Sequence, residues 1–335
     1  MTQITIKDIA RKLNISPSTV SRALRSHPDI SRATRDRVML MAEQCNYQPN
    51  RIAQSLQTRQ TNTIGVIVPE IKHNFFSSAI SGIEGVANEA GFVIMVCQSN
   101  ESYCQEVVST RALLSHHVAG LLISISQETE RVEHLDGIVR RRIPLVFFDR
   151  VVPGIAAGTI VVDDAIGARK AVDFLIGRGY QRIGHLAGPQ LISVARERYN
   201  GYRQALQEAG IPIDPQFVVH GGFHEKDGYE GLQRLMALPR PPDAVFTVND
   251  PVAIGAFRFV RERGLRIPGD VALVGFSNNP ISSLIDPPLT TVDQPAFEIG
   301  RSAASLLIDQ ILSGEPLGEP EIRVLKTRLI VRGSA

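Results

Sequence analysis

Short apolar runs alternate with amphipathic helical stretches from Thr63 onward. A short continuous apolar run is typical of a strand that is buried on both faces, and such strands joined by helices form right-handed βαβ units with a parallel sheet. About ten units of this kind exceed one ordinary sheet, so the sequence predicts two doubly wound subdomains. The predicted strands span residues 64–68, 92–96, 120–123, 145–148, 159–162, 183–186, 244–247 and 271–274.

The first sixty residues differ from the rest of the chain in charge. They carry ten Lys and Arg against four Asp and Glu, a local charge of +6, whereas the remaining 275 residues carry 26 against 30, a charge of −4. A basic segment on a mildly acidic body is typical of a module that binds a polyanion. We therefore expect this segment to be a separate module.

The basic segment has the pattern of several short helices. Ile6, Ile9, Ala10 and Leu13 recur at the spacing of one helix face, so a first helix is predicted to end near Asn14. A second helix begins after a turn of three residues, and a third follows it. The segment is therefore predicted to be entirely helical.

The second predicted helix presents hydroxyl and guanidinium groups on one face. Ser16 caps this helix, and Pro17 suits its first turn, where a backbone amide would have no partner within the helix. Val20, Ala23 and Leu24 form its buried stripe. The opposite face carries Pro17, Ser18, Ser21, Arg22 and Arg25.

The third predicted helix is capped by Ser31. Two helices joined by a tight turn form a helix-turn-helix, whose second helix can enter a major groove of DNA. The alternative is a solvated basic helical bundle with no such partner. In the third helix Val38, Met41, Ala42 and Cys45 are predicted to face inward, and Arg32, Arg35 and Arg37 outward.

Eight segments spread through nearly all 335 residues carry a recognisable pattern. They are IKDIA at 6–10, SPSTVSRAL at 16–24, NYQPN at 46–50, FDR at 148–150, LAGP at 186–189, ND at 249–250, VGF at 274–276 and PPLTT at 287–291. In order and spacing these segments resemble the LacI/GalR family of bacterial transcription regulators. The resemblance implies a helix-turn-helix DNA-binding domain over residues 1–48, a hinge helix or linker over 49–62, and an effector-binding and dimerisation domain over 63–335.

The second helix supplies the central predicted contacts with DNA. The guanidinium of Arg22 can pair with the edge of a guanine, and the hydroxyls of Thr19 and Ser21 can contact phosphates. The predicted partner is a palindromic double-stranded DNA operator, bound by a homodimer. The full predicted DNA-binding set is Thr5, Ser16, Pro17, Ser18, Thr19, Ser21, Arg22, Arg25, Asn50, Ala53 and Leu56.

The predicted hinge can form two turns of helix capped by Asn50, with Ile52, Ala53 and Leu56 along one side. Two turns alone are unstable in water because nucleation is costly, so a partner must complete them. The resemblance implies that two hinge helices of a dimer pair in the minor groove, with Leu56 wedged into a kinked base step. The alternative is a flexible spacer with an incidental leucine.

The resemblance also implies a body of the periplasmic-binding-protein type, with the ligand in a cleft between two lobes. The fold class is thus a small all-α helix-turn-helix head joined by a hinge helix to an α/β body of two doubly wound parallel-sheet subdomains. The chain is expected to cross between the lobes near Val161, Thr291 and Arg323. Lobe one then comprises about residues 63–160 and 291–322, and lobe two about 161–290 and 323–335.

Polar and aromatic residues follow the predicted strands at their carboxyl ends, where open parallel sheets bind ligands. Carboxylates and amides pair with hydroxyls, and an aromatic ring can cover the apolar face of a sugar, so these residues suit a polyhydroxylated ligand. Asp250, which precedes Pro251, is interpreted instead as a helix N-cap. Carrying the family's pocket over position by position predicts effector contacts from His73, Phe75, Asp149, Ser193, Arg196, Phe223, Asn249, Ser277 and Gln294.

Two departures from the family pattern bear on the ligand. Relatives commonly have Asn-Pro before the paired phenylalanines, where this chain has His73 and Asn74, and Asp where it has Ser277. Loss of that carboxylate, with Arg150 and Arg196 nearby, favours an acidic ligand. The predicted effector is therefore a sugar or sugar acid, with a purine as the open alternative.

Other functions are disfavoured. The chain lacks G-x-G-x-x-G, G-x-x-x-x-G-K-[ST] and G-x-S-x-G motifs, so catalysis on a nucleotide-binding core is not expected, and neither is a cofactor. The start of the chain has no apolar leader and no run approaches a membrane span, which argues against a transport receptor and predicts a cytoplasmic protein without membrane contact.

No metal site is predicted from the cysteines or from the paired histidines. Cys45, Cys97 and Cys104 lack zinc-type spacing and are interpreted as reduced thiols. His116 and His117 are adjacent, and neighbours in a helix do not face one point. The chain's last residues carry no heptad extension, which favours a dimer over a tetramer.

Overall fold

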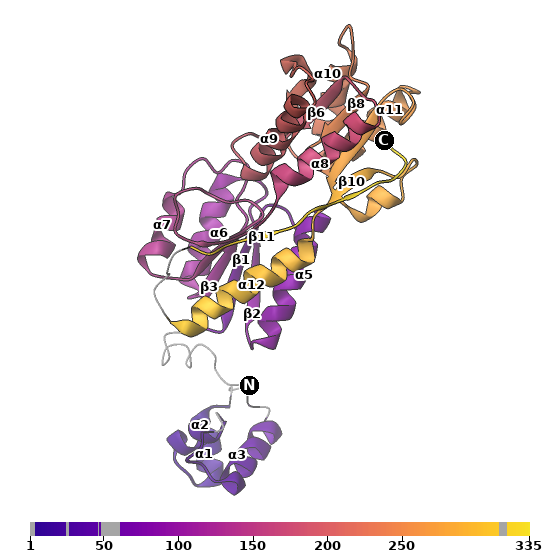
Figure 1. Cartoon of the computed structure of the whole chain (residues 1–335). Helices are drawn as coiled ribbons and strands as arrows, with labels where there is room; N and C mark the ends of the chain where they lie inside the picture. The colour runs from indigo at the N-terminus through magenta and orange to yellow at the C-terminus, as the bar shows by residue number, and fades with distance from the viewer. Residues whose placement is uncertain (1–3, 25–26, 46, 48–60, 315–319) are drawn as a thin grey trace. The chain divides into compact units, whose positions relative to one another are not determined.

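The computed structural model describes residues 4–24, 27–45, 47, 61–314 and 320–335, which belong to two compact units, Met1–Thr61 and Asn62–Ala335 (Figure 1). We describe each unit by itself. The predicted contact residues Arg25, Asn50, Ala53 and Leu56 lie outside the described residues, as does most of the predicted hinge helix.

The first unit contains the three predicted helices, α1 (Ile6–Leu13), α2 (Pro17–Leu24) and α3 (Arg32–Gln44). The predicted caps are confirmed, because the hydroxyl oxygens of Ser16 and Ser31 accept hydrogen bonds from the amides of Thr19 and Thr34 at 3.0 and 3.3 Å. The buried core of this unit consists of Ile9, Ala10, Val20, Ala23, Val38 and Ala42.

The outward orientation predicted for Arg35 is wrong. Its Nη2 atom donates to the carbonyl oxygens of His27 and Ile30 at 3.4 and 3.5 Å, so the side chain covers the segment between α2 and α3. Arg32 and Arg37 are exposed, as predicted. The difference arises because the carbonyl groups after α2 need donors, and the guanidinium reaches them from the first turn of α3.

The second unit consists of two six-stranded sheets, each the centre of one lobe (Figure 1). All eight predicted strands are present. The sheet of lobe one has the order β11 (Ile322–Leu325), β5 (Gly158–Val162), β4 (Leu145–Phe148), β3 (Gly120–Ile123), β1 (Thr63–Val68) and β2 (Val93–Gln98). The sheet of lobe two has the order β12 (Arg328–Ile330), β10 (Thr290–Asp293), β9 (Ala272–Ser277), β8 (Ala244–Thr247), β6 (Ile183–Ala187) and β7 (Val218–His220).

Every strand pairing is parallel except that of β12 with β10. The central strands β3, β4 and β8 are buried at every position, which agrees with sheets covered on both faces. The helices of lobe one are α5 (Asn74–Glu89), α6 (Tyr103–Ser115), α7 (Glu133–Arg140) and α12 (Ala296–Ser313). Those of lobe two are α8 (Asp164–Gly177), α9 (Ser193–Glu208), α10 (Glu225–Met236) and α11 (Asp250–Glu262), with short 3-10 helices at Pro215–Phe217 and Pro280–Ser283.

The chain crosses between the lobes two to three residues later than the sequence predicts. β5 continues through Val162 in lobe one, β10 pairs with β9 in lobe two through Asp293, and β11 pairs with β5 in lobe one through Leu325. The predicted crossing points therefore lie inside strands. Each crossing follows the last residue that forms hydrogen bonds in a sheet, because leaving earlier would abandon those bonds.

Helices α5 and α12 lie side by side along lobe one (Figure 1). Their closeness depends on glycine, because a Cβ atom at Gly300 would overlap the carbonyl oxygen of Ala79, and one at Gly82 would overlap that of Phe297. Each helix thus contributes one glycine to the contact. The packing fixes the start of α5, which carries residues of the cleft described below.

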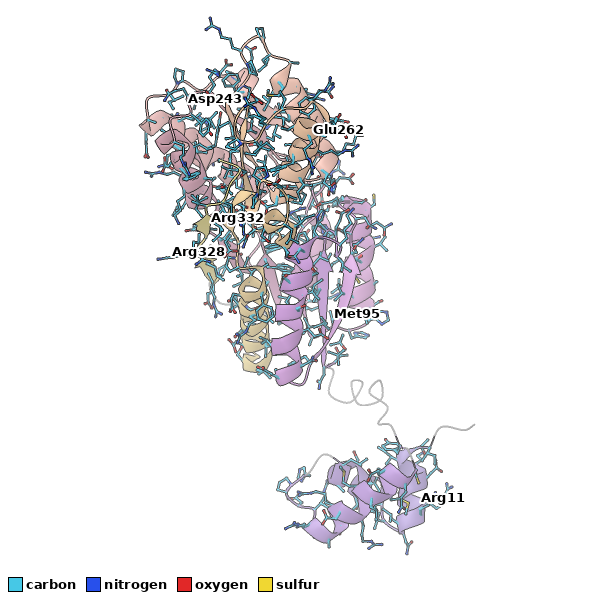
Figure 2. The ribbon with its side chains drawn as sticks, turned by 90° about the vertical axis from the view of Figure 1, so that its right-hand side faces the viewer. Arg11, Met95, Asp243, Glu262, Arg328 and Arg332 are labelled. Atoms are coloured by element: carbon cyan, nitrogen blue, oxygen red, sulfur yellow. The ribbon has the colours of Figure 1, made fainter. Side chains whose placement is uncertain are left out.

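The C-terminal strands belong to both lobes (Figure 2). β11 pairs in lobe one and β12, which carries Arg328, pairs in lobe two. Within the part of the chain that the structure describes, no helix is long and apolar enough to cross a membrane.

Candidate functional site

A cleft with about 600 Å³ of empty space, part of it open to solvent, lies where the strands of both lobes end. Clefts lined by aromatic rings and a few convergent polar groups are typical of small-molecule sites. The lining residues follow the carboxyl ends of strands, as expected for open parallel sheets. They are His73, Asn74, Phe75, Phe76, Asp149, Arg150, Val194, Arg198, Phe223, Asn249, Pro251, Ser277, Asn279 and Gln294.

Seven of the nine predicted effector residues line this cleft. His73 and Phe75 lie at the start of α5, and Asp149 follows β4 in the same lobe. From lobe two, or from the crossing after it, come Phe223, Asn249, Ser277 and Gln294. The sequence therefore predicted half of the fourteen lining residues from strand ends and family resemblance, without any contact information.

Ser193 and Arg196 are not among the lining residues. Ser193 is buried at the first position of α9, and its hydroxyl accepts a hydrogen bond of 3.2 Å from the amide of Val151 in lobe one. The side chain of Arg196, which was predicted to contact the effector, is 45% exposed and lies 3.6 Å from the Glu197 carboxylate. The arginine of α9 in the lining is Arg198.

Arg198 is a buried cation held from several sides. Its Nε atom donates to Asp164 Oδ1 at 2.8 Å, its Nη1 atom to the carbonyl oxygen of Val248 at 2.7 Å, and its Nη2 atom to Gln294 Oε1 at 3.4 Å. The guanidinium also lies 3.7 Å from the centre of the Phe276 ring, within range of a cation–π interaction. Burial raises the pKa of Asp164 to about 7, although Arg198 opposes this shift.

The spacing of apolar residues in α9 predicts that position 198 is buried, although an arginine there would normally be expected on the surface. Ala195, Arg198 and Tyr202 follow one another at helical spacings of three and four, Val194 lies four residues before Arg198, and all four are buried. Arg196 does not fit this stripe, because two residues along a helix correspond to a rotation of roughly 200°. An arginine within an apolar stripe is expected only where it has buried partners.

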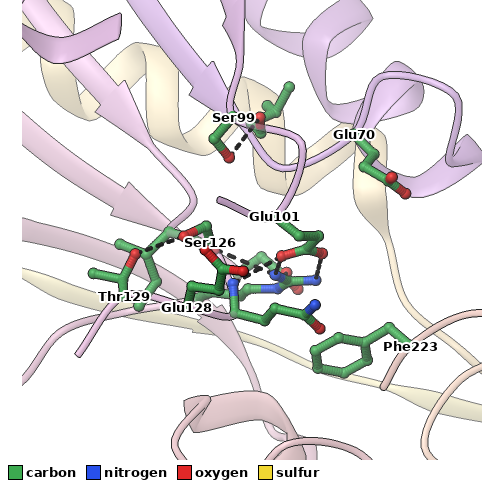
Figure 3. Close-up of polar contacts among 12 residues, drawn as sticks. Glu70, Ser99, Glu101, Ser126, Glu128, Thr129 and Phe223 are labelled. Carbon is green, nitrogen blue, oxygen red and sulfur yellow. Dashed lines mark hydrogen bonds and ion pairs between the residues drawn. The ribbon is translucent and has the colours of Figure 1, made fainter. Parts of the chain in front are cut away.

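Arg150 forms a second buried ion pair. Its Nη1 and Nη2 atoms donate to the two carboxylate oxygens of Glu101 at 2.7 and 2.9 Å (Figure 3). The guanidinium carbon lies 4.5 Å from the centre of the Phe223 ring in lobe two and 5.7 Å from that of Phe76. Glu101 was missed in the sequence, although it follows the end of β2; its backbone φ of 58° is unusual for a residue other than glycine.

Asp149 contributes a carboxylate to the lining of the cleft. Burial raises its pKa, and the charges of Arg150 and Arg198 oppose that shift. Gln294 Nε2 donates to Asp149 Oδ1 at 3.0 Å, while its Oε1 atom accepts from Arg198. Gln294 thereby connects a carboxylate of lobe one with a guanidinium of lobe two.

Asn249, rather than Asp250, caps helix α11. The Asn249 Oδ1 atom accepts from the amide of Val252 at 2.9 Å, and its Nδ2 atom donates to the carbonyl oxygen of Phe223 at 3.0 Å. The prediction of Asp250 as the N-cap was therefore off by one residue. The buried carboxylate of Asp250 instead accepts hydrogen bonds from the Asn279 amide and from the hydroxyls of Ser282 and Thr291.

In the first unit, the structure places the predicted DNA-contact residues on and beside α2. Pro17, Ser18 and Arg22 are exposed, and Thr19 and Ser21 are half-buried. Ser16 Oγ lies within hydrogen-bond distance of the hydroxyls of Ser18 and Thr19, so these hydroxyls form one cluster. Thr5 caps α1, where its amide and hydroxyl both donate to Asp8 Oδ2.

Comparison with known proteins shows the family to which this chain belongs. Residues 5–50 match the profile described as bacterial regulatory proteins, lacI family, and residues 172–335 match the periplasmic binding protein-like domain. The chain is 36% identical to the HTH-type transcriptional repressor CytR of Escherichia coli (strain K12), over 99% of this chain and 96% of that protein. The chain belongs to the lacI family of bacterial regulatory proteins. As a member of the lacI family it is a DNA-binding transcription regulator.

Further lacI-family relatives are similar over nearly the whole length. The HTH-type transcriptional repressor PurR of Vibrio atlanticus (strain LGP32) is 32% identical, over 92% of each chain. Among solved structures, the lac repressor dimer bound to operator and the anti-inducer ONPF has a TM-score of 0.87 at 27% identity, covering 99% of both chains. The complex of the transcriptional regulator CelR with cellobiose has a TM-score of 0.76 at 30% identity, covering 99% of this chain and 100% of that one. These relatives are regulators and not enzymes.

Proposed function

We propose that this lacI-family regulator is a homodimeric repressor that binds a palindromic operator and changes its operator affinity when a small neutral ligand rich in hydroxyls enters the cleft. The repressor function is supported by the similarity to CytR and PurR, which are both named as repressors. Dimeric operator binding is supported by the similarity to the lac repressor dimer bound to operator.

One observation carries the proposal of a hydroxyl-bearing ligand. Arg150 Nε is buried without a hydrogen-bond partner among the described residues, and it lies 3.9 Å from Asp149 Oδ2, beyond hydrogen-bond distance. Both residues line the cleft. A hydroxyl group is a donor and an acceptor at once, so a single one can accept from Arg150 and donate to Asp149.

The charges around the cleft favour a neutral ligand over an acidic one. The two arginines in the lining, Arg150 and Arg198, are already paired with Glu101 and Asp164. An anionic ligand would have to compete with these buried carboxylates and would also be repelled by an ionised Asp149. We therefore favour a neutral sugar as the ligand. The sugar acid, which the replacement of the family's Asp by Ser277 suggests, is less favoured.

The apolar part of the lining suits a ring-shaped ligand. Phe75, Phe76 and Phe223 contribute aromatic rings, which can cover the apolar face of a sugar. Two similar structures, the CelR–cellobiose complex and a LacI family regulator from Enterococcus faecium with bound ribose, hold sugars. A nucleoside or purine is the second candidate, because the same three rings can stack on a base.

Contacts across the lobe boundary support a coupling between ligand binding in the cleft and the affinity for operator DNA. Gln294 links Asp149 to Arg198, and the Val151 amide donates to Ser193. A ligand that touches both lobes must favour one lobe arrangement, and only such differential affinity can shift an equilibrium. The proposed hinge, with Leu56 in the minor groove, would transmit this arrangement to the operator.

Ligand screening against a selected operator tests the proposal. Palindromic operators would be selected in vitro from random DNA with the full chain, and operator affinity would be measured by fluorescence anisotropy. Thermal-shift screening would cover pentoses, hexoses, disaccharides, sugar acids, nucleosides and purines. We expect a neutral sugar or nucleoside both to stabilise the protein and to change operator affinity. A response confined to sugar acids would reject the neutral ligand.

The DNA half of the proposal is tested separately with Arg22. If its guanidinium reads a guanine edge, Arg22→Ala should cost roughly 1–3 kcal/mol of operator binding and relax specificity at one base pair in each half-site. The exposed Arg37 on α3 provides the control, since Arg37→Ala should leave base preference unchanged. Equal weakening on operator and random DNA would make Arg22 a phosphate contact instead.

A further inference from the structure

Two histidines and a glutamate from different lobes converge beside the cleft. Glu70 lies in the turn after β1, His73 is the N-cap of α5, and His224 is the N-cap of α10 in lobe two. One potential ligand atom from each residue lies within 4.8 Å of the other two. Figure 3 shows Glu70 and Phe223, the neighbour of His224, on the facing segments of the two lobes.

The distances suit a small transition-metal ion. His73 Nε2 lies 2.6 Å from Glu70 Oε2, and His224 Nδ1 lies 3.7 Å from the same oxygen. Donor atoms around a tetrahedral zinc ion are about 3.4 Å apart, given metal–ligand distances of about 2.0–2.1 Å. The observed separations lie on either side of this value, so small side-chain rotations suffice to surround an ion.

The glutamate oxygen at the centre of the cluster has no other partner. Glu70 Oε2 is buried, and none of the described residues contacts it with hydrogen-bond geometry, although His73 Nε2 is close. The other oxygen, Oε1, lies 3.2 Å from Lys72 Nζ. Oε2 faces the ring nitrogens of His73 and His224, and Lys72 lies against the other oxygen, as outer partners of metal ligands do.

Burial lowers the pKa of the His73 imidazole, and the neighbouring Glu70 carboxylate opposes this shift. Burial alone would raise the pKa of Glu70, but the hydrogen bond from Lys72 and the charges of His224, His73 and Lys72 outweigh it, and the pKa is lowered. The two helix N-termini disfavour a cation, and the ionised Glu70 offsets them.

We propose that Glu70, His73 and His224 form a binding site for a divalent transition-metal ion, zinc by preference, which ties the two lobes together at the edge of the cleft. Two imidazoles and one carboxylate suit zinc, cobalt or nickel rather than magnesium or calcium. The His73 and His224 rings lie 5.7 Å apart with a tilt of 20°, on facing sides of the lobe boundary.

Metal binding by the full chain tests the site directly. We would titrate chelator-treated protein with Co²⁺, follow its visible absorption, and count imidazole ligands by X-ray absorption spectroscopy. The wild type should bind one Co²⁺ per chain at this site with two imidazoles, and Zn²⁺ should displace it. In His224→Gln the bound Co²⁺ should retain one imidazole ligand. Its affinity should fall at least about tenfold, because removal of even an outer partner of a metal ligand typically weakens metal binding by that factor.

Two further variants decide between this site and an accidental one. Glu70→Gln keeps the side-chain size but removes the charge, and should weaken binding by at least about tenfold as well. His116→Gln changes an exposed histidine next to another histidine, outside the cluster, and should bind Co²⁺ like the wild type. Absence of saturable binding, unchanged binding in His224→Gln, or loss of binding in His116→Gln would overturn the proposal.

Discussion

At the scale of single residues, the cleft depends on which arginine of α9 faces inward. Arg198 contacts Asp164, Val248 and Gln294, whereas Arg196 is 45% exposed. Arg198→Lys keeps the charge but loses the planar fork that donates to several acceptors at once. We expect effector affinity, measured by calorimetry, to fall roughly tenfold to hundredfold, the equivalent of one charged hydrogen bond.

The matched substitution Arg196→Lys lies two residues away in the same helix and should leave effector affinity unchanged. If both variants bind effector alike, Arg198 is a structural cation and the ligand does not reach it. The inward orientation of Arg198 could be predicted from the buried stripe of α9. The hydrogen-bond partners of Arg198 could not be predicted. Asp164 and Gln294 lie 34 and 96 residues away, and only the folded lobes bring them together.

Asp164 gives the protein a pH dependence that can be assigned to one residue. Burial raises its pKa to about 7, against about 3.9 in an unfolded chain. The folded state therefore binds more protons than the unfolded state between these values, so the stability that Asp164 contributes is lost as pH rises through about 7. Compared with Asp164→Asn, the wild type should lose free energy of unfolding as the pH rises from about 4 to about 7 in urea titrations.

The control for this titration lies on the same helix. Asp173 is 48% exposed and lies 3.4 Å from Arg169, so Asp173→Asn controls for the removal of a carboxylate from this helix. Parallel profiles for the wild type and Asp164→Asn would mean that Asp164 does not titrate in this range.

At the scale of elements, the contact of α5 with α12 fixes the part of lobe one that carries His73 and Phe75. A Cβ atom at Gly300 would overlap the Ala79 carbonyl oxygen, so the helices must move apart in Gly300→Ala. Overpacking of this kind costs about 1–3 kcal/mol of the free energy of unfolding, which denaturant titration would measure.

Gly85 provides the comparison within α5. No atom lies within 4 Å of a Cβ built there, and alanine is favoured over glycine inside helices by about 0.5–1 kcal/mol. Gly85→Ala should therefore stabilise the protein slightly while Gly300→Ala destabilises it. Equal effects of the two changes would show that the helix contact is not tight.

The same scale shows why some strands were predictable and others were not. β3 and β4 are continuous apolar runs that are buried throughout, and sequence alone identified them. β11 alternates exposed and half-buried positions, and its place beside β5 depends on residues more than 150 positions earlier in the chain. Short edge strands like β11 and β12 carry little local signal.

At the scale of the whole molecule, the proposed switch requires that the cleft and the operator influence each other equally. If effector binding changes operator affinity by some factor, operator must change effector affinity by the same factor, typically about 5–150-fold. We would measure operator affinity with and without saturating effector, and effector affinity with and without saturating operator, both at fixed salt because phosphate contacts are salt-dependent. We expect the two ratios to agree.

In Arg198→Lys effector should bind more weakly, yet the ratios should still agree, because linkage holds for any pair of equilibria. Unequal ratios in the wild type would reveal a further bound species, and ratios of one would leave the cleft a ligand site without control over DNA binding.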